Sequence, residues 1–436
     1  MVVTPTSRRR FVAAAGAALL SGCSGTDEPD RTATVTPVDV PRSADDVLSA
    51  VESIPVPSVP PAPVVSAAHR RAVVDHVDER IRAAEAALAA ADEVTLADVE
   101  SLEDSATPFE ACRSHLRAYG TEPTRQRFRR VARAIEDVAA VTGHARAASG
   151  DLDADGLRGA VDAAGKGLRE LDDALEYRLA SPAIELLPTA AAGEAVLERA
   201  GDTRQAARRA VAEPAEPTPR EAADVWQSVE SLRLATTNAA GYIGTAFDPS
   251  APPRDGAVSE RTGRHIEALA SLEAPRRPNG RALPSRVRTV LSSVRSRRST
   301  VLAAADPTDP ETARRLELLL DAVRIRGQLE AFDDAAAATF ARLDADEGFP
   351  NERLMPEKRA AVERLTALAK AAPLPRHLGR LAEDMVTYGD RLEADRGTDP
   401  VATAHFMYVA AGAYVDRSLE RGQRLADAPD PAPVDN

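Results

Sequence analysis

Apolar residues recur at helical spacing along most of this chain. Between residues 66 and 92 they include Val73, Val77 and Ile81, with arginine and acidic residues between them. Residues three or four positions apart lie on one face of an α-helix, so each such series predicts an amphipathic helix. A similar series runs from residue 316 to 343, and no run of alternating β-branched residues is long enough to favour a sheet. The sequence therefore predicts an all-α fold, a multi-helix bundle.

An uneven internal repeat runs through the chain. Residues 48–55, 266–275 and 365–373 each have the pattern of a short helix that leads through prolines into a long amphipathic helix. The irregular spacing of these segments argues against a solenoid. Two interpretations stay open: two related helical halves that arose by duplication, or chance similarity among alanine-rich helices.

Two segments rich in proline and charge are candidate linkers, at residues 213–219 and 248–256. With 436 residues, of which 44% are hydrophobic, the chain is long enough for one large or two ordinary domains. We expect an N-terminal helical region over residues 65–250 and a C-terminal helical region over residues 257–428.

The first 25 residues have the pattern of an export leader. A cluster of arginines is followed by an apolar, alanine-rich run that extends from Phe11 to Leu20. This run has ten residues, whereas a membrane-spanning helix needs about 20, so a cleaved leader is favoured over a retained transmembrane segment. A short buried helix in a cytoplasmic protein is the alternative. The residues expected to act are Arg8, Arg9 and Phe11 in the export signal, Leu20, Ser21 and Gly22 in the lipobox, and Cys23 in lipidation.

These residues resemble the leaders of lipoproteins that halophilic archaea secrete through the twin-arginine route, although a high-GC bacterium could carry the same leader. The resemblance covers residues 7–25 and carries no information about the mature domain. It implies cleavage before Cys23, a lipid on that thiol and residence on the outer face of the cell membrane. We therefore expect a signal peptide over residues 1–22, and a lipidated cysteine with a Pro/Thr/Asp-rich spacer over residues 23–64. A twin-arginine signal also implies folding before export.

Charge and cysteine content constrain the mature protein further. The chain carries 55 basic and 68 acidic residues, a formal charge of −13, and all but three of the basic residues are arginine. Acidic surfaces with few lysines suit concentrated salt, although GC-rich coding also favours arginine over lysine. Lipid on Cys23 would leave Cys112 as the one remaining cysteine, so no intramolecular disulfide is expected and stability must come from apolar burial.

The sequence contains none of the motifs that commonly mark catalytic or metal sites. There is no Gly-x-Ser-x-Gly, His-Glu-x-x-His or phosphate-loop pattern, and no histidine has a glutamate three residues before it, as di-iron bundles require. His69 and His76 are expected on a solvated flank of the first long helix. Cys112 and His115 have the spacing of half a metal motif, and the sequence shows no obvious second half. We therefore expect a buried cysteine beside an exposed histidine. We expect no catalytic residue, no metal and no cofactor.

Two clusters of arginine, within residues 125–133 and 286–298, raise the question of nucleic-acid binding. An acidic, exported chain with few aromatic residues argues against a nucleic-acid partner. We expect solvated helix faces that pair with neighbouring carboxylates. Contact with anionic lipid headgroups is the alternative.

Half of the phenylalanines and tyrosines lie in the C-terminal third. Residues 405–415 form the most continuously apolar segment of the mature chain, which predicts a central buried helix. A ligand pocket lined by Tyr388, His405, Tyr408 and Met385 is one hypothesis. A core helix whose polar side-chain tips hydrogen-bond inside the protein is the favoured one.

These observations favour a non-enzymatic, lipid-anchored extracytoplasmic protein. It would be held to the membrane by lipid on Cys23 and would bind or scaffold an envelope protein, such as a transporter component. The second hypothesis is a small-molecule or solute-binding lipoprotein that uses the aromatic C-terminal region. The third is an extracytoplasmic enzyme with a site that no sequence motif marks.

Overall fold

The computed structural model describes residues 43–60, 63, 65–90, 106–173, 175, 177–178, 183–212, 216–252, 255–272, 285–305, 315–340, 350–391 and 400–427. The expected export signal, lipobox and lipidated Cys23 lie outside these residues. In the described part the fold is all-α, as predicted, with fourteen α-helices and one short 3₁₀ helix. No described helix combines the length and the apolar character that crossing a membrane requires.

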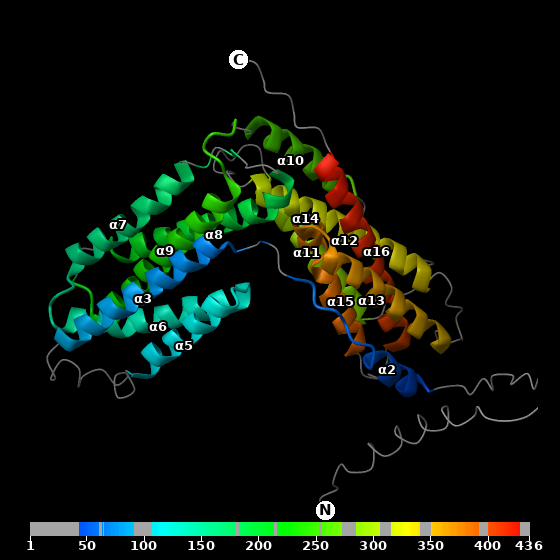
Figure 1. The fold of residues 1–436 in the computed structure, drawn as a ribbon, viewed down its shortest axis with the longest axis horizontal. Helices are drawn as coiled ribbons and strands as arrows, with labels where there is room; N and C mark the ends of the chain where they lie inside the picture. Colours follow the sequence, from blue (N-terminus) through cyan, green and yellow to red (C-terminus); the bar gives the residue numbers. More distant parts are fainter. Residues whose placement is uncertain are drawn as a thin grey trace, which may run out of the picture. The chain divides into compact units, whose positions relative to one another are not determined.

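The helices follow one another along the chain as labelled in Figure 1. The first seven are α2 (Ala44–Glu52), α3 (Ala67–Ala90), α5 (Ala106–Thr121), α6 (Arg125–Ala148), α7 (Ala154–Asp173), α8 (Ala183–Ala210) and α9 (Pro219–Ala246). The remainder are α10 (Asp255–Ala270), α11 (Ser285–Ala304), α12 (Arg315–Phe340), η4 (Asn351–Arg353), α13 (Leu354–Lys370), α14 (Pro373–Gly379), α15 (Leu381–Asp390) and α16 (Pro400–Asp427).

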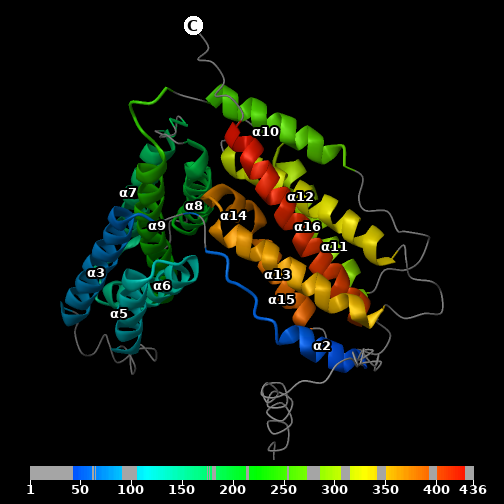
Figure 2. The same ribbon diagram turned by 45° about the vertical axis from the view of Figure 1, so that its right-hand side comes forward.

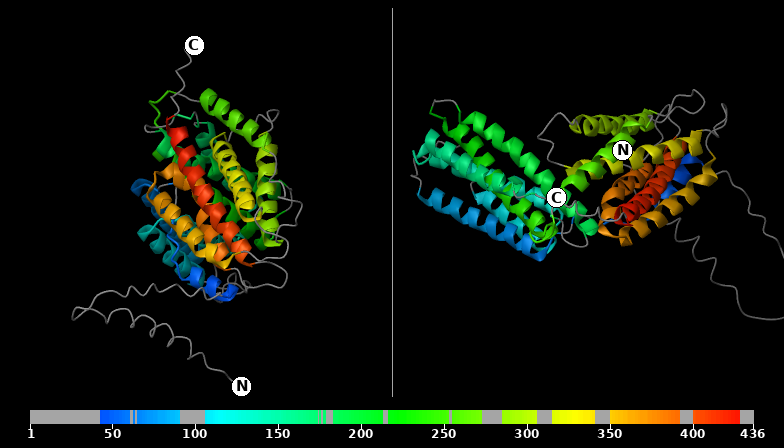
Figure 3. Two further views of the ribbon diagram at one scale, coloured as in Figure 1. Left: turned by 90° about the vertical axis from the view of Figure 1, so that its right-hand side faces the viewer. Right: turned by 90° about the horizontal axis from the view of Figure 1, so that it is seen from above.

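Helix α9 packs against α3, α6, α7 and α8. The right-hand view of Figure 3 shows the helices of this group, coloured from blue to green, running alongside one another. The start of α9 is encoded locally: the Thr218 hydroxyl accepts a hydrogen bond from the Glu221 amide, and the Glu221 carboxylate accepts one from the Thr218 amide. Pro219 follows at the first helical position, where its missing N–H costs no hydrogen bond. Leu232 and Val229 of this helix are buried and pack in the core. The segment around 218 is therefore a defined helix start.

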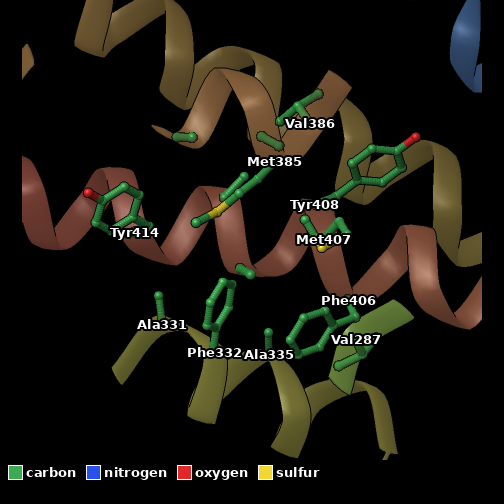
Figure 4. Close-up of a cluster of buried hydrophobic side chains, with 14 of the residues drawn as sticks. Val287, Ala331, Phe332, Ala335, Met385, Val386, Phe406, Met407, Tyr408 and Tyr414 are labelled. Carbon is green, nitrogen blue, oxygen red and sulfur yellow. The ribbon is translucent and has the colours of Figure 1, made fainter. Parts of the chain in front are cut away.

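The helices α3, α6, α7, α8 and α9 form one group, and a second group is centred on α16. Helix α16 packs against α12, α13, α14 and α15. Figure 4 shows its side chains between Phe332 of α12 on one side and Met385 of α15 on the other. The rings of Phe332 and Phe406 stack with their centroids 5.7 Å apart. The predicted buried helix over residues 405–415 is confirmed, because Phe406, Tyr408 and Tyr414 are almost fully buried.

Helix α8 joins the two groups, because it contacts α9 and also α12 and α14. A separate apolar cluster fills this junction and includes Leu187 of α8, Leu320 of α12 and Leu374 of α14. Burial of such side chains contributes roughly 1.5–3 kcal/mol each. The described residues belong to one compact unit.

The expected spacer over residues 23–64 is wrong for its described end. Helix α2 packs against α13 with Val47 and Val51 buried, and the Val59 amide donates to Glu383 at 2.9 Å.

Candidate functional site

Helices α10, α12 and α16 enclose a cleft of about 600 Å³ that is lined mainly by charged side chains. The three helices lie next to one another in Figure 2, with α12 between α10 and α16 in the contacts that they make. Helical periodicity brings the charges to this side, since residues three, four or seven positions apart share one helix face. The arginines that line the cleft are Arg261, Arg264, Arg326, Arg417, Arg421 and Arg424.

Glu330 of α12 holds several of these arginines in place. Its carboxylate accepts hydrogen bonds from Arg326 Nε at 2.9 Å, from Arg417 Nε at 3.2 Å and from Arg421 Nη2. Burial alone would raise the pKa of Glu330, but the hydrogen bonds and charges of these arginines bring it below its ordinary value. Glu330 is therefore ionised at neutral pH, and one negative charge is shared among several guanidinium groups.

His265 of α10 reports the electrostatic character of the cleft. Burial is the main cause that lowers its pKa, and the positive charges of the lining arginines lower it further, to about 4. An imidazole with this pKa is neutral at pH 7. A proton on His265 is disfavoured because the imidazole is buried and because the nearby arginines are already positive.

Other carboxylates offset part of this charge, since Glu260 pairs with Arg264 and Asp334 pairs with Arg417. Asp416 and Glu420 line the cleft. Asp416 pairs with Arg364, and Glu420 pairs with Arg424. Among the described residues that line the cleft, arginines still outnumber carboxylates two to one. A concave surface with this excess attracts negatively charged groups, and guanidinium groups bind carboxylates and phosphates with two parallel hydrogen bonds.

The aromatic residues proposed for a ligand pocket lie elsewhere, on α15 and α16. The Tyr408 hydroxyl donates to Asp390 Oδ1 at 2.8 Å, and His405 Nδ1 lies 2.9 Å from the Thr339 hydroxyl. Both side chains are buried, whereas Tyr388 is 37% exposed. In Figure 4 the Tyr408 hydroxyl points away from the apolar side chains around it. A pocket formed by Tyr388, His405 and Tyr408 stays a prediction, and the contacts observed are those of a core helix with partnered polar tips.

A buried ion pair explains the position of Tyr408. The Lys358 side chain is fully buried and its ammonium binds Asp390, the same carboxylate that accepts the Tyr408 hydroxyl. The ammonium also lies 5.3 Å from the centroid of the Tyr408 ring. A buried charge of this kind requires such partners. The polar groups of Lys358 and Tyr408 thus both have a partner inside the protein, and that partner is Asp390.

The expectation that His69 lies on a solvated helix flank is wrong. His69 is 2% exposed, its Nε2 lies 2.9 Å from Asn238 Oδ1, and its ring meets that of Tyr242 edge to face. Gly241 makes this possible, because a Cβ at that position would lie 2.1 Å from the His69 ring. Helical periodicity alone could not reveal this contact, since the glycine lies more than 150 residues away. Cys112 is buried, as expected.

The arginine clusters predicted to be solvated faces have local partners where they are described. Arg127 pairs with Glu122 and donates to the Ala118 carbonyl. Arg298 donates to the Leu269 and Ala270 carbonyls at the end of α10. The cleft arginines, by contrast, were not singled out from sequence. Their spacing along α16 is visible in the sequence, but the sequence does not show that α10 and α12 face the same space.

Among the residues that the structure describes, no group of three or more histidine, cysteine or acidic side chains could hold a metal ion. Residues 68–248, less than half of the chain, match a family model described as a domain of unknown function (DUF8262). No curated protein and no solved structure matches the chain. The matched segment runs from α3 to α9, and the arginine-lined cleft lies outside it.

Proposed function

We propose that this chain is a non-catalytic binding protein, anchored by lipid on Cys23 at the extracytoplasmic face of the cell membrane. Its binding surface is the arginine-lined cleft of α10, α12 and α16, and its ligand is an acidic segment of an envelope protein. The observation that carries the proposal is the excess of arginine around one concave site. The leader sequence supports the location. Because α2 packs in the core, only the residues between Cys23 and α2 would act as a spacer between the folded part and the lipid headgroups.

The overall charge of the chain makes this cleft distinctive. The protein has a formal charge of −13, so most of its surface repels acidic partners. A local region of positive charge then attracts an acidic partner and also orients it, because an acidic partner is attracted to this face and repelled by an acidic surface elsewhere. Such complementarity sets specificity and the association rate more than affinity.

The lining of the cleft favours a protein segment over an apolar small molecule. Sites for small ligands are mostly apolar, with a few polar groups that fix orientation. Here the lining is mainly charged, and the side chains of Arg264 and Arg424 are 62% and 75% exposed at the rim. Accessible arginines around a wide opening suit several carboxylates on a flexible chain. The aromatic region gives less support to a small-molecule function, because the polar atoms of Tyr408 and His405 have partners inside the protein.

A direct test measures the affinity of the purified chain for a glutamate-rich peptide at fixed ionic strength. Neutralising the rim with Arg264→Gln and Arg424→Gln should weaken binding about tenfold at ~0.1 M salt, since each lost contact of an exposed arginine removes about 0.7 kcal/mol. The matched control is Arg82→Gln with Arg158→Gln, which removes two arginines that also form intrahelical ion pairs but lie away from the cleft.

Equal weakening in the control pair would show that binding depends on overall charge, and the proposal would fail. Tighter binding of a single-stranded oligonucleotide or of inorganic phosphate than of the peptide would also contradict it. In native membranes at native salt, a cross-linked partner should be captured by the lipidated protein and by the control pair. The same partner should be lost with the cleft variant.

A further inference from the structure

A second, smaller cavity lies between α3, α6 and α9 and is distinct from the arginine-lined cleft. Its volume is about 180 Å³. Its apolar lining comes from Ala83, Ala84 and Ala87 of α3 and from Ile135 and Val138 of α6. Trp226 of α9 closes one side. All of these residues belong to the segment that matches the family model.

Three alanines and Arg80 form the part of the lining that α3 contributes, and Ala83 among them is exposed to solvent. Ile135, Val138 and Trp226 are buried, so the space is apolar on their side and open to solvent on the side of Ala83. An apolar cavity of roughly 150 Å³ is large enough for benzene. The apolar part of the cavity therefore fits one ring or a short branched chain.

The polar end of the cavity has a net positive charge. Arg80 forms two hydrogen bonds with Glu230, at 2.8 and 2.7 Å, and Arg233 also binds Glu230, at 2.6 Å. The Glu230 side chain is only 4% exposed, so these charges interact in a poorly solvated environment. Arg146 lines the cavity as well, with its guanidinium 4.7 Å from the centroid of the Trp226 ring. The charged residues that line the cavity are thus two cations, Arg80 and Arg146, and one carboxylate, Glu230.

We propose that this cavity binds a small organic monocarboxylate with a compact apolar body, such as an aromatic acid. The body would occupy the space between the alanines of α3 and the aliphatic residues of α6. The carboxylate would bind the guanidinium of Arg146, because Arg80 is already paired with Glu230. This site is independent of the proposed binding of an acidic protein, and either can fail without the other.

Trp226 supplies a direct readout, because it is the chain's one tryptophan and it lines the cavity. Titration of the full chain with benzoate should change the tryptophan fluorescence to saturation, with a Kd on the order of 1 mM or below for so small a ligand. Benzylamine, which has the same ring and the opposite charge, should bind at least tenfold more weakly. Equal or tighter binding of benzylamine would overturn the assignment to a carboxylate.

A cavity-filling variant locates the site. Ala87→Leu should fill the apolar space and abolish the benzoate response while the melting temperature stays equal or rises, since leucine is also a good helix former. The matched control is Ala86→Leu, which adds the same atoms on the exposed side of α3. An unchanged benzoate titration in folded Ala87→Leu would show that binding occurs elsewhere. Arg146→Gln should reduce the preference for benzoate over benzyl alcohol, and an unaltered preference would remove Arg146 from the site.

Discussion

The side chain of Glu194 on α8 accepts a hydrogen bond from the backbone amide of Glu317, in the first turn of α12, at 2.9 Å. The Leu316 amide points to the same carboxyl group, and the Tyr177 hydroxyl is a further partner. A carboxyl group thus caps a helix that begins more than 100 residues later. This contact lies at the junction of the two helix groups. The protonation state of Glu194 therefore affects the stability of the packing between α8 and α12.

The pH dependence of stability should reveal this buried carboxyl group. Burial raises the pKa of Glu194 to about 8, although its hydrogen bonds oppose that shift. Between the ordinary value of 4.5 and about 8 the folded state therefore binds more protons than the unfolded state. The free energy of unfolding should fall as the pH rises through this window, by up to about 1.4 kcal/mol per pH unit from this group.

Replacing Glu194 by glutamine should remove that contribution and flatten the profile, as measured by urea unfolding at a series of pH values. The control is Glu185→Gln, which removes an exposed carboxylate from the same helix. If the two variants keep the same slope as the parent protein, Glu194 does not carry the effect.

Two glycines of α9, three positions apart, should respond in opposite ways to alanine. Gly241→Ala places a methyl group against the His69 ring, and overpacking of this kind costs about 1–3 kcal/mol. At Gly244 nothing lies within 4 Å of an added Cβ, so Gly244→Ala should stabilise the helix by up to about 1 kcal/mol. Thermal unfolding of both variants tests the prediction, and a stabilised Gly241→Ala would show that His69 moves aside without cost.

Breaking the buried ion pair between Lys358 and Asp390 should cost far more stability than removing the Tyr408 hydroxyl that binds the same carboxylate. Asp390→Asn leaves a fully buried ammonium without its counter-charge, which should cost about 3–5 kcal/mol of stability. Tyr408→Phe removes one hydrogen bond and should cost about 0.5–1.5 kcal/mol. Combining Lys358→Met with Asp390→Asn should recover most of the loss. Chemical denaturation measures all three, and similar costs for the first two variants would contradict the ion-pair account.

Binding of an acidic peptide in the arginine-lined cleft should raise the pKa of His265. Burial and the neighbouring arginines hold that pKa at about 4 in the unliganded protein. Added negative charge favours the imidazolium, so the pKa should move upward by a measurable fraction of a unit. Titration of the imidazole by NMR, with and without the peptide, checks this. A pKa that is the same in both titrations would place the peptide outside the cleft.

Membrane anchorage is predicted to depend on the thiol of Cys23. Cys23→Ser removes the site of lipidation and should release the processed protein from the membrane, because the spacer that follows is hydrophilic. Membrane fractionation measures the change, with Cys112→Ser as the control for loss of a thiol. Retention of the processed Cys23→Ser protein in the membrane fraction would argue against the lipid anchor.

Local patterns in the sequence were enough to predict the helices themselves. The periodicity around Val73 and Val77 corresponds to α3, and the apolar run at residues 405–415 corresponds to the buried centre of α16. Both predictions succeed because a helix forms from contacts three and four residues apart, and because burial on all sides requires apolar residues on all sides.

Tertiary structure alone decided which helix faces meet. The cleft depends on α10, α12 and α16 facing one space, the burial of His69 depends on a glycine of α9, and the buried carboxyl of Glu194 depends on the start of α12. These contacts join residues far apart in the chain, and many pairings of amphipathic helices would satisfy the same periodicity. The sequence thus determined that the protein is helical, and side-chain packing between distant helices determined where its charged and apolar cavities lie.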